Sequence, residues 1–170
     1  MKLLEESFDR ILHPIDIIED IASVQSLPFN RTADDEISMS VSGKWCNYEI
    51  NFNWHDDLEG LHLACIFDAK IPKHRLEEVF RLTAKINELQ WFGHFDIWSR
   101  EPKLLFRYSL LLSGGVNPSI EQCKAMMQHV IKASEKYYPS FQYVIWGGNT
   151  AEQAIENALE IKAKKDLLPL

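Results

Sequence analysis

The sequence predicts a single α+β domain built on an antiparallel sheet of five strands, with helices packed mainly on one face. Two observations lead to this fold class. Three segments between Glu36 and Ala69 follow one another closely and carry alternating or continuous apolar residues, as strands do. Apolar residues at helical spacing come before and after them, in the order α-β-β-β-α-β-β-α.

Length and composition are those of an ordinary globular protein. Of 170 residues, 46% are hydrophobic and 25% are charged.

No apolar run approaches the ~20 residues of a membrane span, and acidic residues near the N-terminus argue against a signal peptide. We therefore expect a cytoplasmic protein without membrane contact. The net charge of -7, from 18 basic and 25 acidic residues, disfavours nucleic-acid binding.

The three cysteines, Cys46, Cys65 and Cys123, are far apart and lack the spacing of a metal site. Two lie on the apolar sides of predicted strands, and the third lies in a helical pattern. We expect reduced core thiols, and the sequence predicts no cofactor and no metal.

The first well-marked helix is predicted to begin at Pro14 and to end before Pro28. Residues 1–13 form an N-terminal extension. Residues 29–35 are predicted to add at most a short extended piece. The apolar stripe of the helix contains Ile15, Ile18, Ile21 and Ala22.

The first hairpin follows from alternation over residues 37–54, and Ser42-Gly43 predicts a tight two-residue turn within it. A slip of one residue in its second strand would bury asparagines and a glutamate, so the register is strongly specified. Residues 61–67 are apolar on both sides and predict a central third strand. The apolar side of the second strand contains Cys46, Tyr48, Ile50, Phe52 and Trp54. Its polar side contains Trp45, Asn47, Glu49, Asn51 and Asn53.

A helix that opens at Ile71-Pro72 leads to a second hairpin. Residues 91–98 predict the fourth strand and residues 104–112 the fifth, with Arg107 opposite the apolar stripe of the fifth. The helix stripe is expected on the covered face of the sheet. It contains Leu76, Val79, Leu82, Ile86 and Leu89.

The C-terminal part is predicted to be helical. Asn117-Pro118 is interpreted as the cap and first turn of a long amphipathic helix, which Pro139 is expected to interrupt. Residues 141–146 fit either a helical turn or a strand. Thr150 and Gln153 have the spacing of a capping box, which starts a last helix.

Three motifs resemble the YbjN family of bacterial sensory-transduction regulators. They are Ser42-Gly43-Lys44-Trp45-Cys46, Phe92-Gly93-His94-Phe95-Asp96-Ile97-Trp98 and the run from Tyr138 to Gly148. The resemblance covers about residues 14 to 160 and implies a YbjN-like core at 14–148 and a C-terminal helix at 149–170. The element order is also similar to that of class I type III secretion chaperones, which are small, acidic and dimeric. The resemblance implies a chaperone-like fold and a regulatory role through protein contacts, with no catalytic residues to carry over.

Outward tryptophans give the strongest functional signal. Trp45 and Trp98 lie on strand sides that are otherwise polar, where large rings are typical of interface hot spots. The alternative is that both rings lie under a loop or the C-terminal helix. Trp54 and Trp91 end apolar stripes and are expected in the core, while Trp146 fits either place. The residues expected to contact a partner are Trp45, Trp98, His94, Asp96, Asn47 and Glu49.

The prediction is therefore a non-enzymatic, homodimeric protein that binds a protein partner, in a bacterial signalling or stress pathway. The alternative is a small-ligand-binding protein or enzyme that uses His62, His94, Asp96 and Glu49 on one sheet face. Two imidazoles and two carboxylates could serve a metal site or acid–base chemistry. That alternative requires the four side chains to converge in a pocket, and solvated polar residues are the simpler interpretation.

Overall fold

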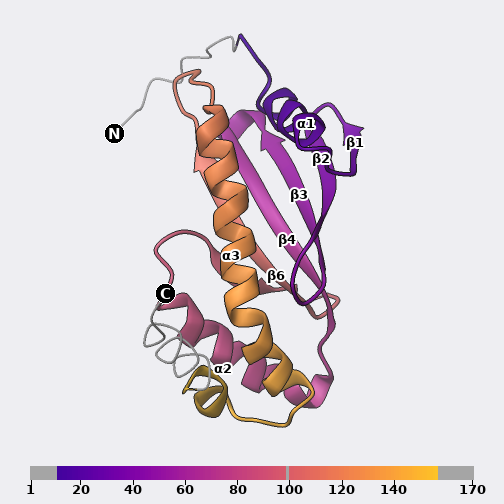
Figure 1. The fold of residues 1–170 in the computed structure, drawn as a ribbon. Coiled ribbons are helices and arrows are strands. Elements are labelled where there is room, and N and C mark those ends of the chain that lie inside the picture. The colour runs from indigo at the N-terminus through magenta and orange to yellow at the C-terminus, as the bar shows by residue number, and fades with distance from the viewer. Residues whose placement is uncertain (1–10, 99, 157–170) are drawn as a thin grey trace, which may run out of the picture.

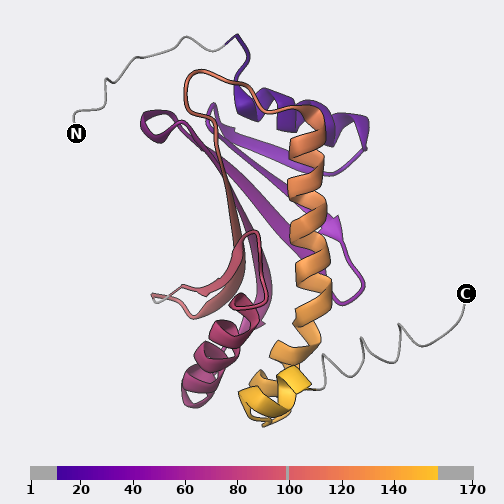
Figure 2. The same cartoon turned by 90° about the vertical axis from the view of Figure 1, so that its left-hand side faces the viewer.

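The computed structural model describes residues 11–98 and 100–156. Their strands form one six-stranded antiparallel sheet in the order β1-β2-β3-β4-β6-β5. Helices α1 (Pro14–Val24) and α3 (Ile120–Ile145) lie on one face of it (Figures 1 and 2). The predicted α+β fold class is confirmed. The strands are β1 (Phe29–Ala33), β2 (Glu36–Ser42), β3 (Asn47–His55), β4 (Gly60–Lys70), β5 (His94–Ile97) and β6 (Lys103–Leu111).

The sixth strand is β1, which pairs with β2 at one edge of the sheet. The sequence predicted only a short extended piece here. In the structure the burial of its side chains does not alternate, so the strand has no apolar stripe. Arg31 of β1 instead pairs with two carboxylates of α1, and its guanidinium lies 2.6 Å from both Asp16 and Glu19. Main-chain pairing and this ion pair hold the strand without an apolar stripe.

The core lies between the sheet and the two helices, and the register matches the predicted faces. Ile50 and Phe52 of β3 are opposite Cys65 and Leu63 of β4, and Phe106 of β6 is opposite Cys65. All five side chains are fully buried. Alternation in the sequence was therefore a sound guide to which face of each strand is covered.

The turn between β2 and β3 is wider than predicted. Ser42 pairs with Asn47, which leaves a four-residue loop, and the Gly43 N–H donates to the Cys46 carbonyl at 3.0 Å. A Cβ on Gly43 would meet the Tyr48 ring at 2.1 Å, so glycine is needed for close approach. The prediction that Trp45 and Cys46 lie in the strand is wrong, because β3 begins at Asn47.

Helix α2 (Leu76–Asn87) begins after a 3-10 turn at Lys73–Arg75, later than the predicted start at Ile71-Pro72. It packs against α3 and β5 at one end of the sheet (Figure 1) rather than across the covered face. The Asn87 side chain bonds the Phe95 main chain twice, accepting from its N–H at 2.8 Å and donating to its carbonyl at 3.0 Å. These bonds cap part of the β5 edge.

Helix α3 differs from its prediction at both ends. Its N-cap is Ser119, whose hydroxyl accepts from the Gln122 N–H at 3.0 Å, so Asn117-Pro118 precede the cap. The helix continues through Pro139 to Ile145, which resolves residues 141–145 as helix.

The last predicted capping box is confirmed, since the Gln153 N–H donates to the Thr150 hydroxyl at 3.3 Å. Residues 151–156 are helical. The remainder of the helix predicted there lies outside the described residues.

Candidate functional site

The face of the sheet opposite α1 and α3 carries no helix within the described part of the chain (Figure 2). We call it the outer face. One row of it runs across four strands, through Asn51, Ala64, Arg107 and His94. Strand alternation places polar residues at its β3 side and a mixture of charged, aromatic and apolar residues at its β6–β5 side. Most of the predicted site residues are found here.

Arg107 organises the polar part of the outer face. Its Nε donates to His62 Nε2 at 3.2 Å, and its Nη1 lies 3.1 Å from Asp96 Oδ2. His94 is opposite Arg107 in the β5–β6 register. Burial, and then the Arg107 guanidinium and His94, lower the pKa of His62. The neutral imidazole is favoured, as its acceptor role toward Arg107 requires. We call Arg107, His62 and Asp96 the Arg107 cluster.

The four residues of the predicted ligand or enzyme site do not meet as a group. The structure brings His62, His94 and Asp96 around Arg107. Glu49 of β3 and Asp96 of β5 lie in the same row across the sheet, with Ile66 of β4 and Leu105 of β6 between them. Three strand spacings therefore separate the two carboxylates. Each spacing is roughly 4.8 Å, which puts Glu49 far beyond hydrogen-bond reach of Asp96.

The Arg107 cluster is internally paired. Asp96 Oδ2 bonds Arg107, and Asp96 Oδ1 accepts from the Ile97 N–H at 2.8 Å. The His62 nitrogen that faces Arg107 is an acceptor already in use. Within residues 11–98 and 100–156, no three His, Cys, Asp or Glu side chains are grouped as metal ligands would be. The geometry therefore fits a polar network that stiffens the sheet better than an acid–base pair.

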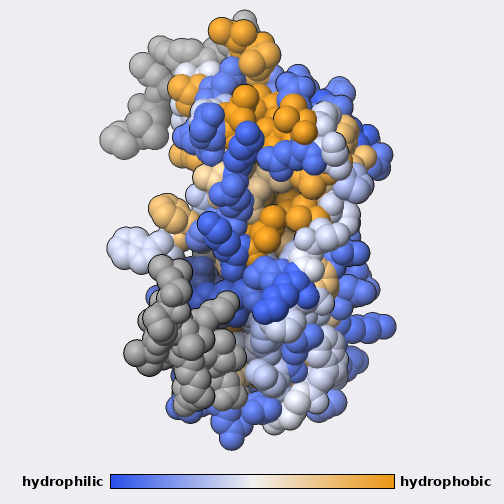
Figure 3. All heavy atoms as spheres, viewed as in Figure 1, coloured by the Kyte–Doolittle hydropathy of each residue, from blue (hydrophilic) through white to orange (hydrophobic). Residues whose placement is uncertain are grey.

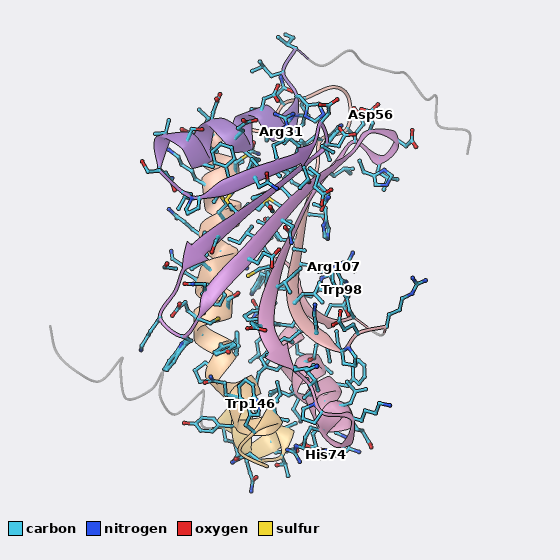
Figure 4. All side chains as sticks on the ribbon, turned by 90° about the vertical axis from the view of Figure 1, so that its right-hand side faces the viewer. Arg31, Asp56, His74, Trp98, Arg107 and Trp146 are labelled. Carbon is cyan, nitrogen blue, oxygen red and sulfur yellow. The ribbon has the colours of Figure 1, made fainter. Side chains whose placement is uncertain are left out.

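Trp98 lies just beyond β5 on the outer face, and Figure 4 shows Trp98 and Arg107 on the same side of the sheet, away from α3. Its main-chain N–H donates to the Lys103 carbonyl at 3.1 Å, while its side chain remains 46% exposed. Leu105 and Ile66 are neighbours on this face, and Leu105 is only 1% exposed. The Leu105 side chain is therefore already covered, and the accessible features of this side are the half-exposed indole, the partly exposed Ile66 and the charged network.

Trp45 lies elsewhere, because its ring is bonded to α3. The indole N–H donates to the Glu135 carbonyl at 3.0 Å. Pro139 has no N–H to supply the usual helical bond to that carbonyl. The Glu135 carboxylate also accepts from the Lys44 N–H and from the Tyr48 hydroxyl, at 2.5 and 3.2 Å. Trp45 is 42% exposed but has a clear structural role, fastening the β2–β3 turn where the α3 ladder is broken.

The other tryptophans divide between core and surface. Trp54 is buried, as predicted. Trp91 is 93% exposed, so its predicted core position is wrong: it lies in the loop after α2, beyond the end of the helical stripe. Trp146 is 56% exposed at the C-cap of α3 and appears at the far end of the molecule from Asp56 in Figure 4.

Hydrophobic residues also reach the surface on the helix-covered side, around α1 and beside α3 (Figure 3). Val24 at the end of α1 is one of the exposed apolar side chains. This area is on the opposite face of the sheet from Trp98. The two apolar areas are therefore separate surfaces.

The thiols offer no reactive group. All three cysteines are free, as predicted, and Cys65 and Cys123 are buried. Burial raises the pKa of Cys65 to about 12 and that of Cys123 to about 11. The thiolate form is scarce near neutral pH, so these side chains act as apolar packing groups.

Comparison with known proteins identifies the fold and the family. The model of the YbjN family, described as "Putative bacterial sensory transduction regulator", matches residues 14–143. The structure of the ExsC–ExsE complex matches with a TM-score of 0.55 and 14% identity, over 72% of this chain and 88% of that chain. The likeness to ExsC confirms the predicted secretion-chaperone-like fold.

A second solved structure is similar over most of its length. YbjN from E. coli, described as "a putative transcription regulator", matches with a TM-score of 0.54 and 13% identity, over 75% of this chain and 90% of that chain. No curated protein matches the sequence significantly. No described helix combines the length and hydropathy that crossing a bilayer requires.

Proposed function

This chain belongs to the YbjN family, and from that premise we propose that it is a non-enzymatic protein-binding module with a regulatory or chaperone-like role in bacterial signalling or stress responses. The observation that carries the proposal is the outer face, where half-exposed Trp98 and the Arg107 cluster lie on a side of the sheet that no described helix covers. The complex of ExsC with ExsE supports it, since a protein of this fold binds another protein. We place the module in the cytoplasm.

The proposed contact surface is the β6–β5 side of the outer face. Trp98 supplies the large apolar anchor, and His94 and Asp96 supply polar contacts at its rim. Exposed Asn47 and Glu49 extend the surface toward β3. An aromatic anchor with polar surroundings is the usual composition of an interface hot spot. Trp45 contributes to folding through Glu135 rather than to this surface.

The test compares two exposed tryptophans. Trp98→Ala and Trp146→Ala remove similar rings from opposite parts of the chain, and each variant is used to capture partners from the native cell lysate. We expect Trp98→Ala to lose a protein that wild type and Trp146→Ala both retain, with urea midpoints of the two variants unchanged within ~0.3 M. Equal capture by both variants would contradict the proposed surface.

We also propose that the module is a homodimer, by analogy with the small acidic chaperones whose element order it shares. Light scattering at micromolar concentration should then give twice the mass of one 19.8 kDa chain. A monomer mass would exclude the dimer without affecting the proposal for Trp98.

A further inference from the structure

The sheet opens where β4 and β6 lose their register. Pairing runs regularly to Ile66–Leu105 and resumes at Lys70–Lys103, so three residues of β4 face a single residue of β6. On the other side of β4, pairing with β3 ends at Glu49–Ile66. Residues 67–69 therefore lie outside the ladder pairs on both sides. A bulge of this kind bends the bulged strand and locally disrupts its pairing with the neighbouring strand.

A hollow of about 670 Å³ lies at this bulge. This volume is in the range of sites for small molecules, roughly 300–1,000 Å³. Two prolines stand in its wall, and the Pro102 carbonyl accepts from the Ile71 N–H at 3.4 Å. The wall is mostly apolar, as small-molecule sites usually are. Its apolar members are Phe67, Ala69, Ile71, Pro72 and Pro102.

The rim of the hollow is positive, although the whole chain carries a charge of -7. Among the residues that the structure describes, three lysines and two acids line it, which gives these residues a net charge of +1. Lys103 lies 3.2 Å from Glu101, and these two charges compensate each other. In the part of the chain that the structure describes, Lys70 and Lys73 form no ion pair within 4.0 Å, and both are exposed. Asp68 is the remaining acid at the rim.

We propose that this hollow binds a small amphiphilic carboxylate, such as a medium-chain fatty acid. The apolar wall takes the hydrocarbon chain, and Lys70 and Lys73 take the carboxylate at the rim. A net charge of +1 matches one carboxylate and disfavours an amine of the same length. The site is separate from the Arg107 cluster, none of whose members lines it.

The experiment is a calorimetric titration of the full chain with decanoate, below the concentration at which it forms micelles. Decanol and decyltrimethylammonium are titrated in parallel. We expect saturable one-to-one binding of decanoate, with decanol at least several-fold weaker and the cation without binding. Equal affinity for decanol and decanoate, or no binding of decanoate at millimolar concentration, would overturn the proposal.

Charge-reversal variants test the assigned lysines. Lys70→Glu/Lys73→Glu should weaken decanoate binding by about tenfold or more, because two attractive charges become repulsive. Lys124→Glu/Lys132→Glu changes the chain charge equally at two positions of α3 that do not line the hollow, and this variant should bind as wild type does. An equal loss in both variants would show a general charge effect and would refute the site. None of these four lysines is buried, so both variants should fold, which a circular dichroism spectrum checks.

Discussion

Trp45→Phe should destabilise the protein through one hydrogen bond on α3. Pro139 lacks the N–H that would reach the carbonyl of Glu135, four residues earlier in the helix. The Trp45 indole N–H takes that place at 3.0 Å. Phenylalanine keeps most of the apolar ring but has no donor. The substitution therefore leaves the Glu135 carbonyl with neither its helical nor its side-chain partner.

The size of the effect follows from this geometry. A typical internal hydrogen bond contributes about 0.5–1.5 kcal/mol to stability. Trp45 is 42% exposed, so water can reach the freed carbonyl and the loss should be near the lower end, about 0.5–1 kcal/mol. With a urea m value of about 2 kcal/mol/M, this corresponds to a midpoint shift of about 0.3–0.5 M.

The decisive assay is a double-mutant cycle with Pro139→Ala. Alanine restores an N–H at position 139, which can bond the Glu135 carbonyl within the helix. Trp45→Phe should then cost less in the Pro139→Ala background than in wild type, with a coupling of about 0.5 kcal/mol or more. Urea unfolding is measured at one protein concentration for all variants, because dimerisation would shift the midpoints.

Trp146→Phe is the matched control, since it changes another half-exposed tryptophan at the end of the same helix. It should show no coupling to Pro139→Ala. The same cost of Trp45→Phe in both backgrounds would refute the reasoning, because the indole bond would then be unrelated to the missing proline N–H.

Two further predictions concern other polar contacts. Glu59→Ala should lower the free energy of unfolding by about 1–2 kcal/mol, since the Glu59 carboxylate accepts from the N–H groups of Gly114 and Gly115 at 2.9 and 3.1 Å. Asp57→Ala at the same tip is the control. Equal urea midpoints for Glu59→Ala and Asp57→Ala would contradict the role of Glu59. Burial, and then Arg107, lower the pKa of His62 below 6.5, so the stabilisation from its neutral form is present above pH 6.5 and is lost as the pH falls through the folded value. Urea unfolding from pH 7.5 to 5 should therefore show wild type losing more stability than His62→Gln, and parallel pH profiles would contradict this.

Much of the fold could be predicted because it depends on local periodicity. Alternation identified the covered side of β3 and β6, and three- and four-residue steps identified the helices. The strand β1 was only partly predicted, because an ion pair with α1 and main-chain bonds hold it without an apolar pattern. Pro139 misled the prediction for a similar reason, since a donor distant in sequence replaces the bond that proline removes.

The candidate site depended more on contacts between distant segments. The sequence placed His62, His94 and Asp96 on one kind of face, but it did not indicate that Arg107 would join them. Arg107 was visible only as a charge opposite an apolar stripe. Glu49 seemed equivalent to these residues because alternation assigns a face and says nothing about how many strands lie between two positions.

The sequence alone determined the fold class, the family and the face of most strands, because these follow from residue period and short motifs along the chain. The tertiary structure decided that the Trp45 ring is hydrogen-bonded to α3, while Trp98 lies beyond β5 on the outer face. Trp45 and Trp98 occupy equivalent places in the alternating pattern of the sequence. Of the two, only Trp45 donates its indole N–H to the Glu135 carbonyl, which Pro139 leaves without a helical hydrogen bond. That difference depends on the packing of residues about 90 positions apart, a separation at which local periodicity carries no information.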